Sequence, residues 1–217
     1  MSIPKKEMAR PDDDASPRRG HYFDTSPAVA SRPRVFHLNL GELSLQLQGD
    51  RGVFASRGID LGTLTLLREA PPPPRTGDLL DLGCGYGPIA VTLALRAPKA
   101  RVWAIDVNER AVELTRANAA AAGATGVKAC RPDEVPAGTR FDAIYSNPPV
   151  RVGKGPLHDL LLEWVPRLKP GGSAYFVVQR NLGADSLASW LSTQGCEVSR
   201  LKSKKGYRVL EVKPPTA

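Results

Sequence analysis

The chain has 217 residues, a length that fits one medium-sized domain or one domain with a small appendage. Its hydrophobic content of 41% is enough for a substantial core, and no apolar stretch approaches the length that spans a membrane. The formal net charge of +8 favours polyanionic partners, although net charge bears on association and not on fold.

The three cysteines give no sign of a disulfide framework or a zinc site. Cys84, Cys130 and Cys196 are scattered, odd in number and without C-x-x-C spacing. The first residues mix charges with prolines and lack the apolar segment of a signal peptide. We therefore expect a cytoplasmic protein, without a metal site and without a membrane partner.

The chain begins with a segment of low apolar content. Residues 1–20 combine charge runs with prolines, which predicts a disordered tail. Tyr22 and Phe23 follow in an arm that also contains arginines and prolines. Such an arm can stack on RNA bases and contact phosphates, or it can equally pack on the surface of the domain.

Residues 21–77 are predicted to form an N-terminal appendage of arm, hairpin and short helix. Alternating apolar residues over 35–40 and 43–48, around a Gly-Glu turn, indicate the hairpin. Residues 59–67 have the pattern of a short helix laid against the core, and the prolines at 71–74 end it as a stiff linker. The linker is the best candidate boundary before a core of residues 78–217.

From residue 78 onward predicted strands and helices alternate, which indicates an α/β fold with a mostly parallel sheet covered on both faces. After a strand that ends near Asp81, strands are predicted over 101–105, 126–130, 141–145, 174–178, 197–201 and 207–212. Helices are predicted from 89 onward and over 109–122, 155–168 and 182–194. The last two strands are expected to pair as an antiparallel hairpin. Ligands of open parallel sheets bind beyond the carboxyl ends of the strands. Polar residues follow several of the predicted strands, so they are expected at this place.

A glycine-rich turn follows the first of these strands, in the segment Asp81-Leu82-Gly83-Cys84-Gly85-Tyr86-Gly87. Glycines at alternate positions allow a ligand to approach the main chain, and the next helix offers unpaired N–H groups. The carboxylate suits an amino-acid-bearing nucleoside better than a pyrophosphate, which it would repel. The third glycine comes one residue too early for the dinucleotide pattern G-x-G-x-x-G. An ordinary tight turn between strand and helix is the alternative.

This segment resembles motif I of class I S-adenosylmethionine-dependent methyltransferases. The resemblance implies S-adenosylmethionine as cofactor, and the implied binding residues are Asp81, Gly83, Cys84, Gly85, Gly87, Asp106, Asn108 and Asp133. Asp106, at the end of the next strand, would accept hydrogen bonds from the ribose hydroxyls; capping of the next helix by Asp106 or Asn108 is the alternative. Asp133 would contact the adenine amino group, with Glu134 as a close rival and a solvated loop carboxylate as the alternative.

The second motif, Asn147-Pro148-Pro149, follows the strand predicted over 141–145. It resembles the N-P-P motif of methyltransferases that act on planar amino groups, whose nitrogens are poor nucleophiles because their lone pair is delocalised. The Asn147 side-chain oxygen and the Pro148 carbonyl can each accept one amine N–H, and the prolines restrict the backbone before substrate arrives. We therefore predict Asn147, Pro148 and Pro149 as the catalytic residues; a simple turn is the alternative.

Further segments narrow the resemblance to the methyltransferase small-domain family, which includes ribosomal RNA guanine-N2 methyltransferases. These segments are His21-Tyr22-Phe23, Gly52-Val53-Phe54, Asp60-x-Gly62-Thr63, Asn-Pro-Pro-x-Arg-x-Gly-Lys and the stretch 178–184. The resemblance implies a Rossmann-like sheet of seven strands. It also implies methyl transfer to an exocyclic base amine of structured RNA, with guanine N2 of small-subunit ribosomal RNA as the leading target.

Basic residues flank the second motif. Arg151 and Lys154 would contact RNA phosphates beside the reacting centre, or they belong to an ordinary solvated surface. Val150 stands where many N-P-P enzymes have an aromatic ring that stacks on the target base. Two other functions stay open: methylation of a protein glutamine or a small-molecule amine, and an RNA-binding assembly factor that retains the fold without turnover. The intact N-P-P motif argues against the assembly factor.

Overall fold

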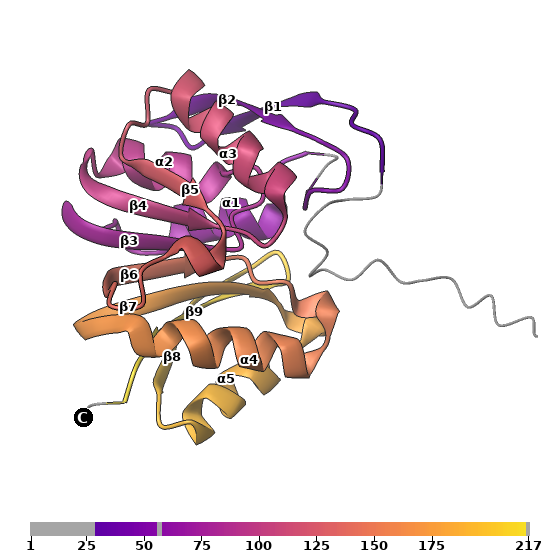
Figure 1. Cartoon of the computed structure of the whole chain (residues 1–217). Helices are drawn as coiled ribbons and strands as arrows, with labels where there is room; N and C mark the ends of the chain where they lie inside the picture. Colours follow the sequence, from indigo (N-terminus) through magenta and orange to yellow (C-terminus); the bar gives the residue numbers. More distant parts are fainter. Residues whose placement is uncertain (1–28, 56–57, 216–217) are drawn as a thin grey trace, which may run out of the picture.

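The computed structural model describes residues 29–55 and 58–215, and it contains a seven-stranded sheet with helices on both faces (Figure 1). The strand order is β5-β4-β3-β6-β7-β9-β8, next to a separate two-stranded hairpin of β1 and β2. Neighbours from β5 to β7 run parallel, and β9 pairs antiparallel with both β7 and β8. The predicted fold class is confirmed. The predicted tail and the arm residues Tyr22 and Phe23 lie outside the described residues.

The elements keep the predicted alternation of strands and helices. The strands are β1 (Arg34–Asn39), β2 (Ser44–Gly49), β3 (Thr76–Leu82), β4 (Lys99–Ile105), β5 (Val127–Cys130), β6 (Phe141–Ser146), β7 (Leu168–Gln179), β8 (Glu197–Lys204) and β9 (Tyr207–Lys213). The helices are α1 (Leu61–Glu69), α2 (Pro88–Arg96), α3 (Glu109–Ala121), α4 (Lys154–Trp164) and α5 (Ala184–Thr193). Among the described residues, none of these helices is both long and apolar enough to cross a membrane.

The strand order reverses direction between β3 and β6, which places a crevice at their carboxyl ends. β4 follows β3 on one side of it, while β6 pairs with β3 on the other, with Asp81 opposite Tyr145. In α/β sheets, the connections that follow two such neighbouring strands leave in opposite directions, and a ligand crevice opens between them. Both motifs singled out in the sequence begin at this point.

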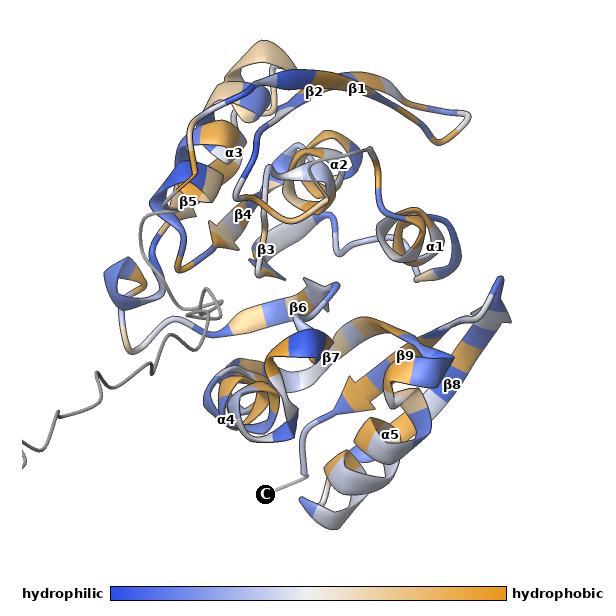
Figure 2. Ribbon diagram, turned by 90° about the vertical axis from the view of Figure 1, so that its right-hand side faces the viewer, coloured by the Kyte–Doolittle hydropathy of each residue, from blue (hydrophilic) through white to orange (hydrophobic). Residues whose placement is uncertain are grey.

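Two hydrophobic cores lie on the two faces of the sheet. Figures 1 and 2 show the helices that cover these faces, α1 to α3 on one side and α4 and α5 on the other. One core joins the sheet to α1, α2, α3 and the β1–β2 hairpin, and the other joins it to α4 and α5. The strands are buried on both faces, so they read as nearly continuous apolar runs, as in Val177 and Val178 of β7. The helix α1 contacts β7, β9 and α2, so it covers the sheet beside the crevice.

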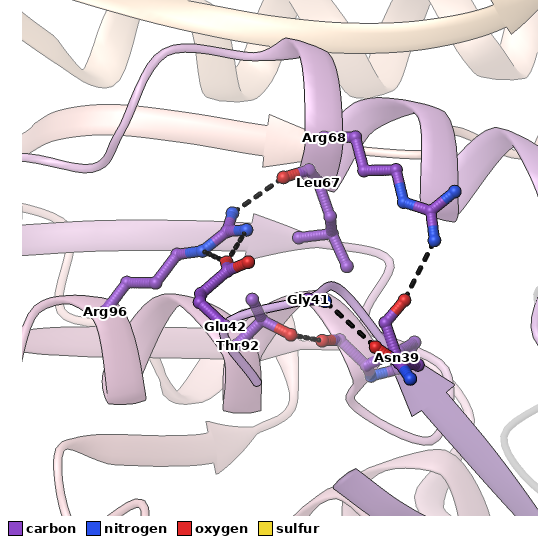
Figure 3. A network of polar contacts seen from close by, with 8 residues as sticks. Asn39, Gly41, Glu42, Leu67, Arg68, Thr92 and Arg96 are labelled. Carbon is purple, nitrogen blue, oxygen red and sulfur yellow. Dashed lines mark hydrogen bonds and ion pairs between the residues drawn. The ribbon is translucent and has the colours of Figure 1, made fainter. Parts of the chain in front are cut away.

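The turn of the β1–β2 hairpin is tied to α1 and α2 by polar contacts. Arg96 donates to the carboxylate of Glu42 and to the Leu67 carbonyl, at 2.7 Å, and Arg68 donates to the Asn39 carbonyl at 2.9 Å (Figure 3). The hydrogen bonds from Arg96 lower the pKa of Glu42. These contacts fix the hairpin against α1 and α2. The predicted division into appendage and core at residue 78 stays a prediction.

The two largest differences between predicted and observed boundaries lie at α4 and β7. The helix predicted over 155–168 ends as α4 at Trp164, and residues 165–167 form a 3₁₀ turn that contains Pro166. Proline has no N–H to donate to the carbonyl four residues earlier, which accounts for the early end. Strand β7 begins at Leu168, earlier than predicted, because Leu168 pairs with Phe141 ahead of an irregular step in the ladder.

Candidate active site

The glycine turn that follows β3 is held by the end of the neighbouring strand β4. The N–H groups of Gly83 and Cys84 both donate to the Ile105 carbonyl at 2.9 Å. Gly83, Gly85 and Gly87 have φ angles of 77°, 58° and 88°, in the left-handed region that glycine adopts without strain. A Cβ at Gly87 would also lie 2.9 Å from the Thr115 side chain on α3.

Asp106 closes this turn from the carboxyl end of β4. Its Oδ2 accepts the Gly85 N–H at 3.0 Å, and its Oδ1 accepts the Asn108 N–H at 2.9 Å. Burial raises the pKa of Asp106, while these backbone donors act to lower it. Each carboxylate oxygen has two lone pairs, so both oxygens retain capacity to accept a ligand hydroxyl.

Asn108 holds neighbouring backbone in place. Its Oδ1 accepts the Arg110 N–H at 3.0 Å as the N-cap of α3. Its Nδ2 donates to the Gly52 carbonyl at 2.8 Å, which ties the loop after β2 to the glycine turn. The cap that the sequence analysis raised as an alternative is therefore made by Asn108 and not by Asp106.

Asp81 lies completely buried at the end of β3. Its Oδ2 accepts the Ala90 N–H from the first turn of α2 at 2.9 Å, whereas its Oδ1 has no hydrogen-bond partner among the described residues. Burial raises the pKa of Asp81 to about 8, and the nearby Asp106 adds to the rise. An unpaired buried carboxyl oxygen is unfavourable, and a cationic ligand group would relieve it.

The remaining predicted cofactor residues have different surroundings. Cys84 is buried, and its sulfur accepts the Thr115 hydroxyl at 3.4 Å. Burial raises the pKa of this thiol well above its ordinary value, as in an unreactive packed cysteine. Asp133 is exposed on a 3₁₀ turn and pairs with Arg131 at 3.3 Å, while Glu134 accepts the Arg131 N–H. Neither carboxylate lines the cavity described next.

The N-P-P segment follows β6 and lies beside the glycine turn. The Ser146 hydroxyl donates to the Leu82 carbonyl at 2.6 Å, which joins the last residues of β6 and β3 immediately before the two turns. An open cavity of about 380 Å³ adjoins the segment. Its lining comprises Phe54, Asp60, Asn147, Pro148, Pro149, Val150, Arg151, Val152, Val177, Val178, Gln179, Leu182 and Tyr207.

Hydrogen bonds orient the Asn147 amide. Its Nδ2 donates to Asp60 Oδ2 at 2.8 Å and to the Thr63 hydroxyl oxygen at 3.1 Å, so both amide hydrogens are used. Oδ1 is therefore the atom that remains to accept a hydrogen bond in the cavity. The Pro148 carbonyl accepts the Val150 N–H at 2.8 Å, which leaves it one lone pair for a further donor.

Cationic side chains lie at the cavity and on the segments next to its lining residues. Arg151 lines the cavity, and the exposed Lys154 begins α4 after the 3₁₀ turn of residues 150–152. Arg180 is exposed beyond β7, and its N–H donates to the Gly206 carbonyl at 2.7 Å, which brings the tip of the β8–β9 hairpin to this side. Within the described part of the chain, Arg151, Lys154 and Arg180 form no ion pair with an acidic side chain.

The cavity also contains residues to which the sequence analysis assigned no role. Phe54 is 55% exposed, and a Cβ at Gly85 would lie 4.0 Å from the Phe54 Cβ, so Phe54 adjoins the glycine turn as well as the cavity. Tyr207 enters from β9, and Asp60 from the start of α1. Phe54 and Asp60 belong to segments quoted for the family resemblance, but only the fold brings them to Asn147.

The predicted residues thus fall into two groups. Asp81, Gly83, Gly85 and Asp106 lie together around the glycine turn, and Asn147, Pro148, Pro149 and Arg151 line the adjoining cavity. Asp133 lies apart on its own exposed turn. Within residues 29–55 and 58–215, no three His, Cys, Asp or Glu side chains cluster closely enough to hold a metal ion.

Comparison with known proteins identifies the family. The model of the methyltransferase small domain matches residues 44–211. The uncharacterized protein YbxB of Bacillus subtilis (strain 168) is 36% identical over 196 residues, which cover 89% of this chain and 98% of that protein.

Longer relatives match over part of their length. The ribosomal RNA small subunit methyltransferase C of Klebsiella pneumoniae is 41% identical over 102 residues, which are 47% of this chain but only 30% of that enzyme. The solved structure of a T. thermophilus 16S rRNA N2 methyltransferase (RsmC), in complex with AdoMet and guanosine, has a TM-score of 0.73 and 26% identity. That match covers 87% of this chain and 52% of the RsmC chain. The chain belongs to the methyltransferase small domain family.

Proposed function

We propose that this chain is an S-adenosylmethionine-dependent N-methyltransferase that acts on an exocyclic base amine of structured RNA. Guanine N2 of small-subunit ribosomal RNA is the leading target. The observation that carries the proposal is the position of the N-P-P turn. Its Asn147 and Pro148 line a cavity directly beside the glycine turn, with the Ser146–Leu82 hydrogen bond joining the two strand ends.

The residues around the glycine turn fit S-adenosylmethionine. The buried, unpaired Oδ1 of Asp81 suits the ammonium group of the methionine part, and ionised Asp81 is favoured by such a cation. The Asp106 oxygens, fixed by the Gly85 and Asn108 N–H groups, suit the ribose hydroxyls. A role for Asp133 at the adenine amino group stays a prediction. The cofactor supplies an electrophilic methyl group on a positively charged sulfur.

On the acceptor side, this chain orients the amine nitrogen. Asn147 Oδ1 and the free lone pair of the Pro148 carbonyl each accept one N–H of the amine. Two acceptors on one side would direct the nitrogen lone pair toward the methyl donor. In the transfer the sulfur–methyl bond would break, with its electron pair left on sulfur, as the C–N bond formed, and the methylated amine would then release one proton. Consecutive prolines hold these acceptors before the substrate arrives, so little reorganisation accompanies the reaction.

Two features support RNA as the substrate. The exposed ring of Phe54 provides, next to the cavity, the aromatic surface that Val150 cannot provide after the prolines, and base–aromatic stacking contributes about 1–3 kcal/mol per base. Arg151, Lys154 and Arg180 leave positive charge at the cavity and on the segments next to its lining residues. The structural relative RsmC is described with AdoMet and guanosine, which supports guanine as the base.

The test uses the purified chain with labelled S-adenosylmethionine and separate fractions of total RNA, protein and metabolites. We expect the label in RNA. It should be in small-subunit ribosomal RNA when the RNA species are separated, and in guanosine after digestion to nucleosides. Asn147→Ala should lower the methylation rate by about 10² or more, since it removes one of two transition-state acceptors, and leave cofactor affinity in calorimetry nearly unchanged.

Two outcomes would contradict the proposal in different ways. Label in the protein or metabolite fraction would assign the acceptor to a glutamine or a small amine. Loss of cofactor binding in Asn147→Ala would show that Asn147 belongs to the cofactor site. As a control, Gln194→Ala removes an exposed amide at the end of α5, which does not line the cavity, and should leave both measurements unchanged.

A further inference from the structure

We infer that Asp60 and Thr63 are positioning residues that set which atom of the Asn147 amide faces the acceptor amine. The effect of this orientation on methylation rests on the proposed function. The hydrogen bonds that orient the amide do not depend on it. Asp60 Oδ2 and the Thr63 hydroxyl oxygen accept the two Nδ2 hydrogens of Asn147, at 2.8 Å and 3.1 Å.

The orientation of this amide matters because its two ends differ in chemistry. An asparagine side chain can turn by 180° and present either two N–H donors or a carbonyl acceptor at the same place. A donor facing a base amine would meet N–H groups and hold the nitrogen poorly. Asp60 in its ionised form can only accept, so Nδ2 is drawn toward it and Oδ1 is left for the substrate.

Asp60 is itself held by the first turn of α1. Its Oδ2 accepts the Thr63 N–H at 3.1 Å as the N-cap of the helix. A Cβ at Gly62 would lie 2.8 Å from this oxygen and 2.8 Å from the Tyr207 ring, so glycine is needed for the close approach. The helix N-terminus therefore fixes the carboxylate, and the carboxylate fixes an amide 87 residues further along the chain.

Asp60 and Thr63 differ in whether they could contact the substrate directly. Asp60 also lines the cavity, so a direct contact with the base is the competing role for it. Thr63 is buried and does not line the cavity, so its hydroxyl can reach the chemistry only through Asn147. Among the cavity-lining residues described, Asp60 is the only acidic one, which leaves no other carboxylate to orient the amide.

An exchange of the two side chains tests the inference. Asn147→Asp places a second carboxylate against Asp60, and we expect a lower urea midpoint and at least a tenfold loss of methylation rate. In the exchanged pair, Asp60→Asn with Asn147→Asp, the amide at position 60 can donate to the carboxylate at position 147. Asparagine at position 60 is also a good N-cap, and the carboxylate at position 147 still offers an acceptor oxygen to the cavity. The exchanged pair should regain most of the stability and much of the rate.

The stability measurement does not depend on activity. If the chain methylated no RNA, the proposed function would fail, but the double-mutant cycle on unfolding in urea would still report whether residues 60 and 147 are coupled. Additive changes in that cycle, with no recovery in the exchanged pair, would overturn the inference.

A second pair of variants separates the positioning role from general damage to α1. Thr63→Val removes the hydroxyl that contacts Asn147, while Thr65→Val removes a buried hydroxyl of the same helix that donates only to the Leu61 carbonyl. We expect Thr63→Val to lower kcat several-fold with little change in the KM for RNA, and Thr65→Val to leave kcat unchanged. Equal effects of the two variants on kcat would contradict the role of Thr63.

Discussion

Asp81 shows how burial changes the chemistry of a carboxyl group at the scale of one residue. Its position before a glycine turn predicts a role in cofactor binding, and that role stays a proposal. The structure adds that one of its oxygens is buried without a partner and that its pKa is raised to about 8. At neutral pH the free protein therefore keeps a large share of Asp81 protonated, and a bound cation would promote proton release.

The raised pKa predicts a pH dependence of stability. Between the ordinary value of 3.8 and about 8, the unfolded chain has lost the Asp81 proton while the folded chain keeps it. The free energy of unfolding should therefore fall as pH rises through this window, by up to about 1.4 kcal/mol per pH unit. Asp81→Asn removes this titrating group. The free energy of unfolding of the variant should therefore increase relative to that of the parent protein as pH rises from 4 to 8.

Urea unfolding of the cofactor-free protein at a series of pH values measures this difference. Asp133→Asn serves as the control, since Asp133 is an exposed carboxyl whose replacement should shift the curve little. Parallel curves for Asp81→Asn and the parent protein across the whole window would show that Asp81 titrates normally in the fold.

At the scale of elements, the β1–β2 hairpin holds the loop that carries Phe54. Asn118 of α3 makes the decisive contacts: its Oδ1 accepts the Gln48 N–H, and its Nδ2 donates to the carbonyls of Gln48 and Tyr86, at 2.7–2.8 Å. One buried side chain thus joins β2, α3 and the glycine turn. The adjoining loop is tied again through the Asn108–Gly52 hydrogen bond.

Replacing this amide should loosen the hairpin. Asn118→Ala leaves three backbone groups without their partner, and we expect a loss of about 1–3 kcal/mol in the free energy of unfolding. Hydrogen exchange at the Gln48 N–H should become faster. Glu113→Ala, at an exposed site on the same helix, should change stability by less than about 0.5 kcal/mol. An equal effect of both substitutions would show that Asn118 does not anchor the hairpin.

At the scale of the whole molecule, exposed basic residues lie at the same edge of the sheet as the carboxyl ends of the parallel strands. The parallel strands end at the crevice, and Arg151, Lys154 and Arg180 follow those ends. Because RNA affinity depends on counterion release, the proposed substrate should bind less tightly as salt rises, with a slope set by the number of phosphate contacts.

Charge reversal at this edge tests the electrostatic part of the proposal. The double variant Arg151→Glu with Lys154→Glu should weaken RNA binding and reduce the slope of log K against log salt by about 1 per lost phosphate contact. The double variant Arg75→Glu with Lys99→Glu is the matched control, because it reverses two exposed charges at the amino ends of β3 and β4, away from the crevice. A flat salt response of the parent protein would favour a protein or small-molecule acceptor.

The sequence by itself determined the fold class, the order of most elements and the family, because these follow from apolar periodicity and from two motifs of local geometry. A glycine turn and an Asn-Pro-Pro corner are recognisable within a few residues. The early end of α4 and the early start of β7 were missed, since helix and strand ends depend on neighbours across the sheet.

The tertiary structure alone decided which residues surround Asn147. Asp60, Thr63, Phe54 and Tyr207 come from three separate parts of the chain, and no local pattern relates them to the N-P-P segment. The sheet order brings them there by placing β3 beside β6 and β9 beside β7, with α1 laid across the latter pair. A hydrogen bond between residues 60 and 147 is a product of that packing, and sequence spacing contains no information about it.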